Sequence, residues 1–173
     1  MSEKKPGGSS RRRGREVALQ VLYAIDIDRD RPRREPSEAD ARGDDDAPAR
    51  PEADPAPASQ TDAIFDAVTE NFEVPPGARR FAQDLVYRVR SHLPELDAAI
   101  ADQAKNWRVS RMAVVDRNIL RLGTYELVHT ETPAAVILNE AVDLARRFSN
   151  DPSPAFVNGI LDAVARSVRE WEP

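Results

Sequence analysis

Three segments of the C-terminal half decide the fold: they read RNILRLGTYEL at residues 117–127, ILNEAVDLARRFS at 137–149 and SPAFVNGILD at 153–162. Their apolar residues recur at every third or fourth position, which is the spacing of one face of an α-helix. Ser110 is in position to cap the first of these helices. The expected buried stripe of that helix is Met112, Val115, Ile119, Leu122 and Leu127.

The same spacing occurs on both sides of these segments, and no alternating, strand-like stretch occurs after residue 60. The expected helices cover residues 62–72, 77–92, 94–107, 134–148 and 153–171. Pro94 and the pair Thr132 and Pro133 suit the starts of two of them. The expected buried residues include Ile64, Phe65, Val68, Phe72, Phe81, Leu85, Val86, Val89, Leu96, Ile100, Ala104, Phe156, Ile160, Val164 and Trp171. With a further helix near the N-terminus, the sequence predicts an all-α bundle of six to seven helices.

The N-terminal segment RRRGREVALQVLY, residues 11–23, predicts an amphipathic helix that begins with four arginines. At about 100° per residue, one arc is apolar: Val17, Ala18, Val21, Leu22 and Ile25. The opposite, solvent-facing arc holds Arg12, Arg13, Glu16, Gln20 and Tyr23. Guanidinium groups pair with phosphates and stack on bases, and a tyrosine ring can stack on an unstacked base. The segment therefore indicates an RNA contact; the alternative is a solvated basic tail whose tyrosine only caps a neighbouring core.

Residues 28–60 contain no apolar residue other than alanine, and they include six prolines. Such a stretch cannot bury enough surface to offset the conformational entropy that ordering would cost. We therefore expect a disordered acidic insert within one domain, residues 11–173, and a disordered basic tail at residues 1–10. We interpret the insert as a solvated linker; the alternative is an acidic arm that mimics RNA and inhibits RNA binding until a partner arrives.

The composition excludes several classes of protein. The chain has 173 residues, enough for one domain, and it has no cysteine, which excludes disulfides, thiolate zinc sites and thiol catalysis. Its net charge is −5, yet residues 1–16 carry six basic groups against two acidic ones. No apolar run approaches the roughly 18 residues of a membrane span, and no secretory signal is present. We expect a cytoplasmic protein with no membrane partner.

Several polar residues attract attention as candidate functional groups. His92 and His129 lie far apart in the sequence with no HExxH spacing, so we expect no metal site. No Gly-rich phosphate loop or recognisable Ser/His/Asp arrangement occurs, so we expect no cofactor and no catalytic residue. Asn139 and Glu140 lie in mid-helix, where we expect them to clamp neighbouring helices. Gly159 inside a helix indicates a tight helix crossing.

Together with residues 11–23, the three C-terminal segments closely resemble the family of the transcription antitermination factor NusB. The resemblance covers nearly all of the chain outside residues 1–10 and 28–60. It implies an all-helical fold of two packed helical subdomains and a non-catalytic, RNA-binding role. NusB-like proteins bind the boxA element of ribosomal RNA leader transcripts together with NusE, which is ribosomal protein S-ten. The complex joins RNA polymerase and other Nus factors in antitermination.

The resemblance also implies site residues. The arginine-rich first helix contacts RNA in the family, and the matching residues here are Arg11, Arg12, Arg13 and Arg15. Tyr23 matches a tyrosine near both RNA and NusE, and Asp116 occupies an acidic position that contributes to NusE binding. Phe156 matches an aromatic residue beside the RNA surface. No catalytic residue and no metal ligand is implied.

The chain departs from the family pattern at two places. Ala155 stands where family members often have a lysine, which removes one phosphate contact, and the insert lengthens the first connection. Some family members form homodimers that hide the RNA surface, so a homodimer is a further expected partner. Two alternatives remain open: a helical dimerisation or interaction module without specific RNA binding, or a detached accessory domain of an rRNA methyltransferase.

Overall fold

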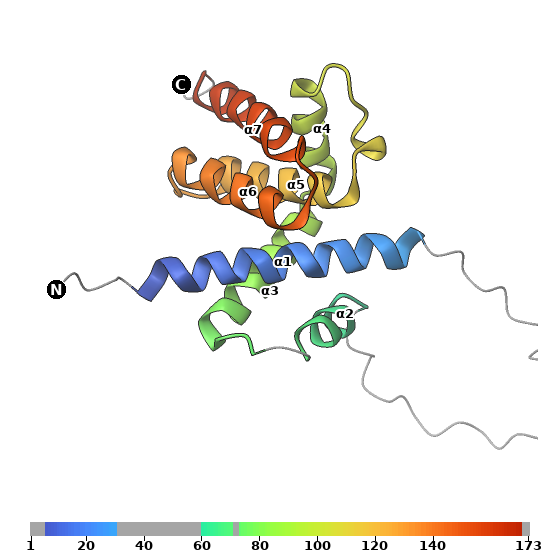
Figure 1. The fold of residues 1–173 in the computed structure, drawn as a ribbon, viewed down its shortest axis with the longest axis vertical. Coiled ribbons are helices and arrows are strands. Elements are labelled where there is room, and N and C mark those ends of the chain that lie inside the picture. Colours follow the sequence, from blue (N-terminus) through green and yellow to red (C-terminus); the bar gives the residue numbers. More distant parts are fainter. Residues whose placement is uncertain (1–5, 31–59, 71–72, 171–173) are drawn as a thin grey trace, which may run out of the picture.

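The first helix crosses the molecule between two groups of helices. In the computed structural model, which describes residues 6–30, 60–70 and 73–170, α1 covers Pro6–Asp30. Figure 1 shows α2 (Gln60–Thr69) and α3 (Pro76–Ser91) on one side of α1, and α4 to α7 on the other. Val17, Ala18, Val21 and Leu22 are buried, which confirms the predicted apolar arc of α1.

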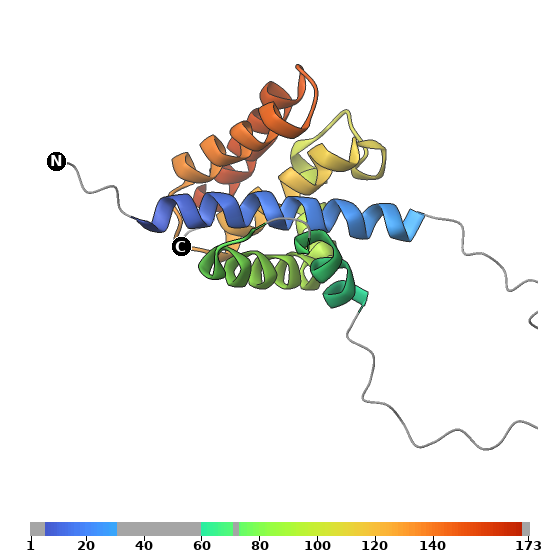
Figure 2. The same ribbon diagram turned by 60° about the horizontal axis from the view of Figure 1, so that its bottom comes forward.

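The second group packs around α5. It consists of α4 (Leu93–Gln103), a short 3-10 turn η1 (Val109–Arg111), α5 (Val114–His129), α6 (Ala134–Phe148) and α7 (Ser153–Glu170). α5 contacts α4, α6 and α7 as well as α1, and the turned view of Figure 2 shows α1 lying across the front of this group. The described residues thus form seven α-helices and no strand, which confirms the predicted all-α bundle of two packed subdomains.

A single hydrophobic core joins the two groups. It includes buried residues from all seven helices, among them Phe65 of α2, Ile100 of α4 and Leu161 of α7. Burying a side chain of this size stabilises the fold by about 1.5–3 kcal/mol. The two groups therefore share one core across the described residues. None of the helices in the described ranges is long and apolar enough to cross a lipid bilayer.

The close approach between α7 and α5 lies at Gly123 of α5, not at Gly159 of α7. A Cβ added to Gly123 in α5 would lie 2.7 Å from Cδ1 of Leu161 in α7. A Cβ on Gly159 would meet nothing within 4 Å, and Gly159 is exposed. The prediction for Gly159 was wrong because a glycine inside a helix does not reveal which side of that helix its neighbour occupies.

A charged network ties α1, α4 and α5 together. The carboxylate of Asp26 in α1 accepts hydrogen bonds from Arg117 at 2.9 Å, Asn118 at 3.1 Å and Arg121 at 3.2 Å, all in α5. Arg121 also makes a bidentate pair with Asp97 of α4, at 2.7 and 2.8 Å. Burial, the largest effect, lowers the pKa of Arg121, but its bonds and charge interactions with Asp97 and Asp26 together raise it.

Most predicted helices are confirmed, and the connection before α5 is the main error. α6 has the predicted limits, and α3 lies within one residue of its prediction. Ser110 does not cap α5: it lies in η1, and α5 begins at Val114 without a side-chain cap. α4 ends at Gln103, so Trp107 lies in the following turn, where it packs against Phe156. This tertiary contact is invisible to helical spacing.

The ends of the predicted tail and insert are helical. α1 begins at Pro6, so residues 6–10 belong to it, and residues 28–30 extend it at the other end. Gln60 starts α2, and its Nε2 donates to Oδ2 of Asp28 at 2.6 Å. The predicted insert is therefore anchored at two adjacent helix ends, while residues 31–59 lie outside the described residues. Phe72 and Trp171, predicted to be buried, also lie outside them.

Candidate nucleic-acid interface

Three of the four N-terminal arginines reach solvent. Arg11 is exposed, Arg12 forms an ion pair with Asp143 of α6, and Arg13 donates to Glu16 at 2.9 Å. The side chains of Arg12 and Arg13 keep 46% and 34% of their surface exposed. These ion pairs hold the guanidinium groups in place at the surface, where phosphate can still approach them.

Arg15 has a different environment, because its side chain is folded inside the molecule. The residue is 4% exposed, and its Nε and Nη2 donate to the two carboxylate oxygens of Glu126 in α5 at 2.8 and 2.7 Å. Glu140 of α6 lies 3.7 Å from its Nη1. Burial, the largest effect, lowers the pKa of Arg15, but the bond to Glu126 and the charges of Glu126 and Glu140 together raise it. Arg15 therefore stays charged and fixes α1 to α5 and α6.

Glu16 is buried too, contrary to its predicted place on the solvent-facing arc. It is 5% exposed and pairs with both Arg13 and Arg147 of α6. Side chains of α6 reach this side of α1 through the pairs Arg147–Glu16 and Asp143–Arg12, and so α6 brings two more arginines beside the first three. We call the resulting group the basic surface: Arg11, Arg12, Arg13, Arg146 and Arg147. The sequence signal for the added pair was its place in the last turn of an amphipathic helix.

The expected helix clamp is only partly present. Glu140 is half-buried beside Arg15, as the clamp requires, but Asn139 is exposed on the outer side of α6. The amphipathic pattern did not distinguish these two consecutive positions, because helical spacing assigns them to faces only about 100° apart.

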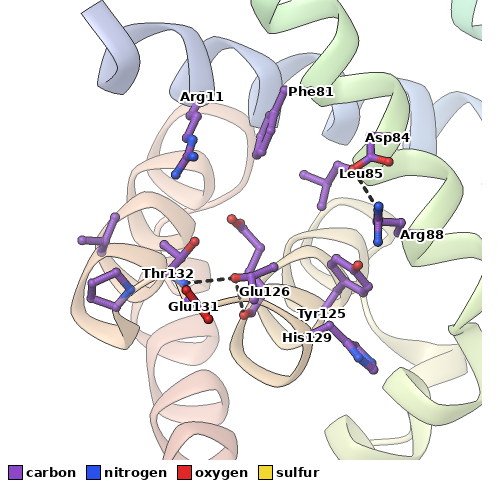
Figure 3. Close-up of a pocket in the computed structure, with 13 residues that line it drawn as sticks. Arg11, Phe81, Asp84, Leu85, Arg88, Tyr125, Glu126, His129, Glu131 and Thr132 are labelled. Atoms are coloured by element: carbon purple, nitrogen blue, oxygen red, sulfur yellow. Dashed lines mark hydrogen bonds and ion pairs between the residues drawn. The ribbon is translucent and has the colours of Figure 1, made fainter. Parts of the chain in front are cut away.

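An open pocket of about 660 Å³ lies beside Arg11, between α1, α3, α5 and the start of α6. Figure 3 shows Arg11 and Phe81 pointing into it from α1 and α3. Tyr125 and Glu126 line it from α5. The aromatic rings suit an unstacked base, and the guanidinium of Arg11 beside them can stack on a base or pair with a phosphate. The pocket thus extends the basic surface with groups that can contact bases.

Tyr23 lies farther along α1 and is 42% exposed. It stands about 16 Å from Arg12 along the helix axis, at 1.5 Å per residue. Its ring lines a hollow of about 310 Å³ together with Val115 of α5 and Phe148 of α6. Since Phe148 directly follows Arg147, the last turn of α6 connects the basic surface to Tyr23.

A second aromatic site lies at the start of α7. Phe156 packs edge-on against Trp107, with ring centroids 5.7 Å apart and an interplanar angle of 69°. The two rings line a small pocket of about 220 Å³ that also includes Asp116. Trp107 is 59% exposed, so sequence reasoning missed a candidate contact by placing it at a helix end. The sequence did contain a signal: Trp107 lies between the polar residues Asn106 and Arg108, which is typical of an exposed position.

Asp116 joins α5 to the junction of α6 and α7. It is 7% exposed, and its two carboxylate oxygens accept hydrogen bonds from Ser149 at 2.6 Å and Ser153 at 2.8 Å. The expected NusE contact therefore occupies a largely buried position. Tyr23, Asp116 and Phe156 nevertheless gather around the first turn of α5, where Val115 faces Tyr23 and Asp116 faces the Phe156 pocket.

The geometry agrees with comparisons with known proteins. The family model described as “NusB family” matches residues 12–166. The “Transcription antitermination protein NusB” of Solibacter usitatus is 39% identical over 162 residues, which cover 94% of this chain and 92% of that protein. The chain therefore belongs to the NusB family.

Solved structures of NusB proteins share the fold. NusB of T. maritima is 27% identical with a TM-score of 0.67, and the match covers 95% of this chain and 93% of that one. A structure of antitermination factors NusB and NusE in complex with dsRNA is 25% identical with a TM-score of 0.67, covering 92% of this chain and 98% of that one. The helical arrangement described above is thus the NusB fold.

Proposed function

We propose that this chain is a non-catalytic, RNA-binding transcription antitermination factor. It binds boxA RNA of ribosomal RNA leader transcripts together with NusE, and through this complex it joins RNA polymerase and the other Nus factors. The observation that carries the proposal is the basic surface on α1 and α6, in a chain that belongs to the NusB family. The place of action is the cytoplasm, where nascent transcripts are made.

The basic surface supplies the affinity. Arg11, Arg12 and Arg13 contact phosphates, and Arg146 and Arg147 extend the path toward Tyr23. Arg15 acts as a positioning residue, because its guanidinium is already bound to Glu126. Phosphate contacts carry no sequence information, so selectivity comes from bases that stack on exposed rings. We assign this role to Tyr23 and to Phe156, with Trp107 beside it.

NusE binds at the first turn of α5. Tyr23 offers an exposed ring there, and Asp116 shapes the adjacent pocket through its bonds to Ser149 and Ser153. In this arrangement NusE and RNA share the region around Tyr23. NusE therefore completes the site for the bases, and the chain alone discriminates weakly between RNA sequences.

The test is fluorescence anisotropy with labelled boxA RNA and a scrambled control, with and without NusE. The informative variant is R11A/R12A, which leaves Arg13 and Arg15 in place as partners of Glu16 and Glu126. The matched control is R29A/R166A, which removes the same charge. Arg29 lies at the far end of α1, about 25 Å from Arg12 at 1.5 Å per residue, and Arg166 lies in the C-terminal half of α7.

We expect NusE to raise the affinity for boxA more than for the scrambled RNA, and R11A/R12A to weaken binding far more than R29A/R166A. With about three to five phosphate contacts on a single strand, the log–log salt slope should be roughly −2 to −3.5, and R11A/R12A should reduce it by about 1.4. If both variants bind boxA as the unaltered protein does, the chain is a helical interaction module instead.

A further inference from the structure

The fold brings together the only two histidines of the chain, which no sequence motif predicts to be neighbours. His92 lies between α3 and α4, Glu95 lies in the first turn of α4, and His129 ends α5. One ligand atom from each of these three residues lies within 4.8 Å of the other two. The group is at the surface, outside the basic surface, and two different parts of the chain contribute to it.

The distances suit a single small cation. Nε2 of His129 lies 3.0 Å from Oε1 of Glu95. Two ligands that each lie about 2.0–2.2 Å from a tetrahedral zinc ion are roughly 3.3–3.5 Å apart. The separation between His129 and Glu95 already approaches this value, and Glu95 is half exposed and free to adjust. The three atoms lie within 4.8 Å of one another, so the longest separation must shorten by up to about 1.5 Å to reach this value.

The imidazole of His92 is oriented as a ligand would be. Its Nδ1 lies 2.7 Å from the carbonyl oxygen of Arg88, so Nδ1 carries the proton and donates it to that carbonyl. This bond leaves the lone pair on Nε2, the arrangement that second-sphere hydrogen bonds impose on metal-binding histidines. A backbone acceptor thus selects the tautomer that can bind a metal through Nε2.

Ring contacts hold the two histidines near each other. The centroids of His92 and His129 are 4.5 Å apart, and Tyr125 stacks on His129 at 5.0 Å with an interplanar angle of 27°. Figure 3 shows Tyr125 and His129 side by side on α5. The neighbouring cation, Arg88, is bound to Asp84 at 2.8 Å, which offsets its charge.

We propose that His92, Glu95 and His129 bind one divalent transition-metal ion, of which Zn²⁺ is the best match. Two imidazole nitrogens and one carboxylate oxygen are a ligand set that zinc prefers, and water completes a four-coordinate site. Such an ion links the α3–α4 junction to the end of α5, beside the pocket that Arg11 lines. The proposal does not depend on the function proposed above.

The test uses the full chain without a histidine tag, labelled with ¹⁵N and titrated with ZnCl₂. With two histidines and no cysteine, the imidazole region of the NMR spectrum reports both proposed nitrogen ligands without interference. We expect both imidazoles to shift together and to saturate at one equivalent of zinc. The melting temperature should rise with zinc in the same titration.

The variants are H92A, H129A and E95Q, and the matched control is E131Q, which alters an exposed carboxylate just beyond the end of α5. Each of the three should weaken zinc binding by at least about tenfold, and E131Q should bind as the unaltered protein does. The proposal is overturned if zinc at one equivalent shifts neither imidazole, or only one. It is also overturned if the folded histidine variants bind zinc normally, which would leave the contact between His129 and Glu95 as a simple surface hydrogen bond.

Discussion

Arg12 and Arg15 lie close together in the sequence but have different roles, because one is exposed and the other is buried. Arg12 forms its ion pair at the surface, where water screens the charges and such a pair contributes about 0–1 kcal/mol. Arg15 forms its pair in the interior, where removing one partner leaves the other charged, buried and uncompensated. The surface arginine is therefore free to serve binding, while the buried one determines how α1 is placed.

We expect R15A to lower the free energy of unfolding by about 3–5 kcal/mol, because it strands the buried carboxylate of Glu126. The double variant R15M/E126L should lose much less, since it removes both charges and keeps apolar volume. R12A should lose no more than about 1 kcal/mol. Urea unfolding followed by circular dichroism gives all three values. An R15A loss as small as that of R12A would contradict a role for Arg15 in holding α1.

The sequence located the arginine cluster but could not tell its members apart. Helical spacing gives the direction of each side chain around α1, and it put Glu16 on the solvent-facing arc. The partners that bury Arg15 and Glu16 are Glu126 and Arg147, more than 100 residues later in the chain. These contacts depend on how the helices pack together, which the local spacing of residues does not predict.

Among the helices, α5 and α7 cross where glycine allows close approach. Gly123 lets Leu161 fill the space that a Cβ would otherwise take, and Leu161 is completely buried. Gly159, in the first half of α7, is exposed and has open space beside it. The same residue type is thus required at one position of the helix pair and dispensable at the other.

We expect opposite effects from two alanine substitutions. G159A should raise the free energy of unfolding by up to about 1 kcal/mol, because alanine is the better helix former. G123A should lower it by roughly 1 kcal/mol, since forcing the buried Leu161 aside costs more than the gain in helix propensity. Chemical unfolding of both variants, compared with the unaltered protein, is the measurement. Equal stabilisation by both would show that the crossing at Gly123 tolerates a methyl group.

At the scale of elements, prediction succeeded where a helix has a single apolar face and clear end signals. Pro133 and the amphipathic spacing set α6 correctly. The prediction placed the start of α5 too early. Residues 104–113 have side chains that are compatible with a helix, but contacts with other parts of the chain determine the conformation of this segment. Met112 is buried without being helical, and Trp107 is turned toward Phe156. The spacing of apolar residues predicts which side chains are buried more readily than it predicts the backbone conformation at those residues.

In the molecule as a whole, α1 contributes residues to both proposed binding sites, the one for RNA and the one for NusE. The three arginines that α1 contributes to the basic surface lie in its first half, and Tyr23 begins the region around α5 where NusE is proposed to bind. The end of α1 meets the start of α2 through Asp28 and Gln60, so the two helices remain adjacent whatever links them. Because the two helix ends are already in contact, we expect that the fold does not depend on the long connection between them.

We expect the chain to keep its fold when residues 31–59 are replaced by a six-residue Gly/Ser linker. If those residues form the flexible loop predicted from the sequence, the shorter connection lowers the entropy cost of closing the loop and should stabilise the protein by about 1.4 kcal/mol. Thermal unfolding measures this gain. Loss of the folded state would show that residues 31–59 contribute contacts to the domain.

The same replacement tests whether the insert competes with RNA. It removes eight acidic and five basic residues, a net charge of −3. The attachment point at Asp30 lies about 27 Å from Arg12 along α1, well beyond the screening length of about 8–10 Å. We therefore expect the affinity for boxA RNA with NusE to change by less than about twofold at physiological salt, where screening limits the effect of distant charges. A much larger gain, abolished at high salt, would mean that the acidic residues fold back over the basic surface and act as a competing anion.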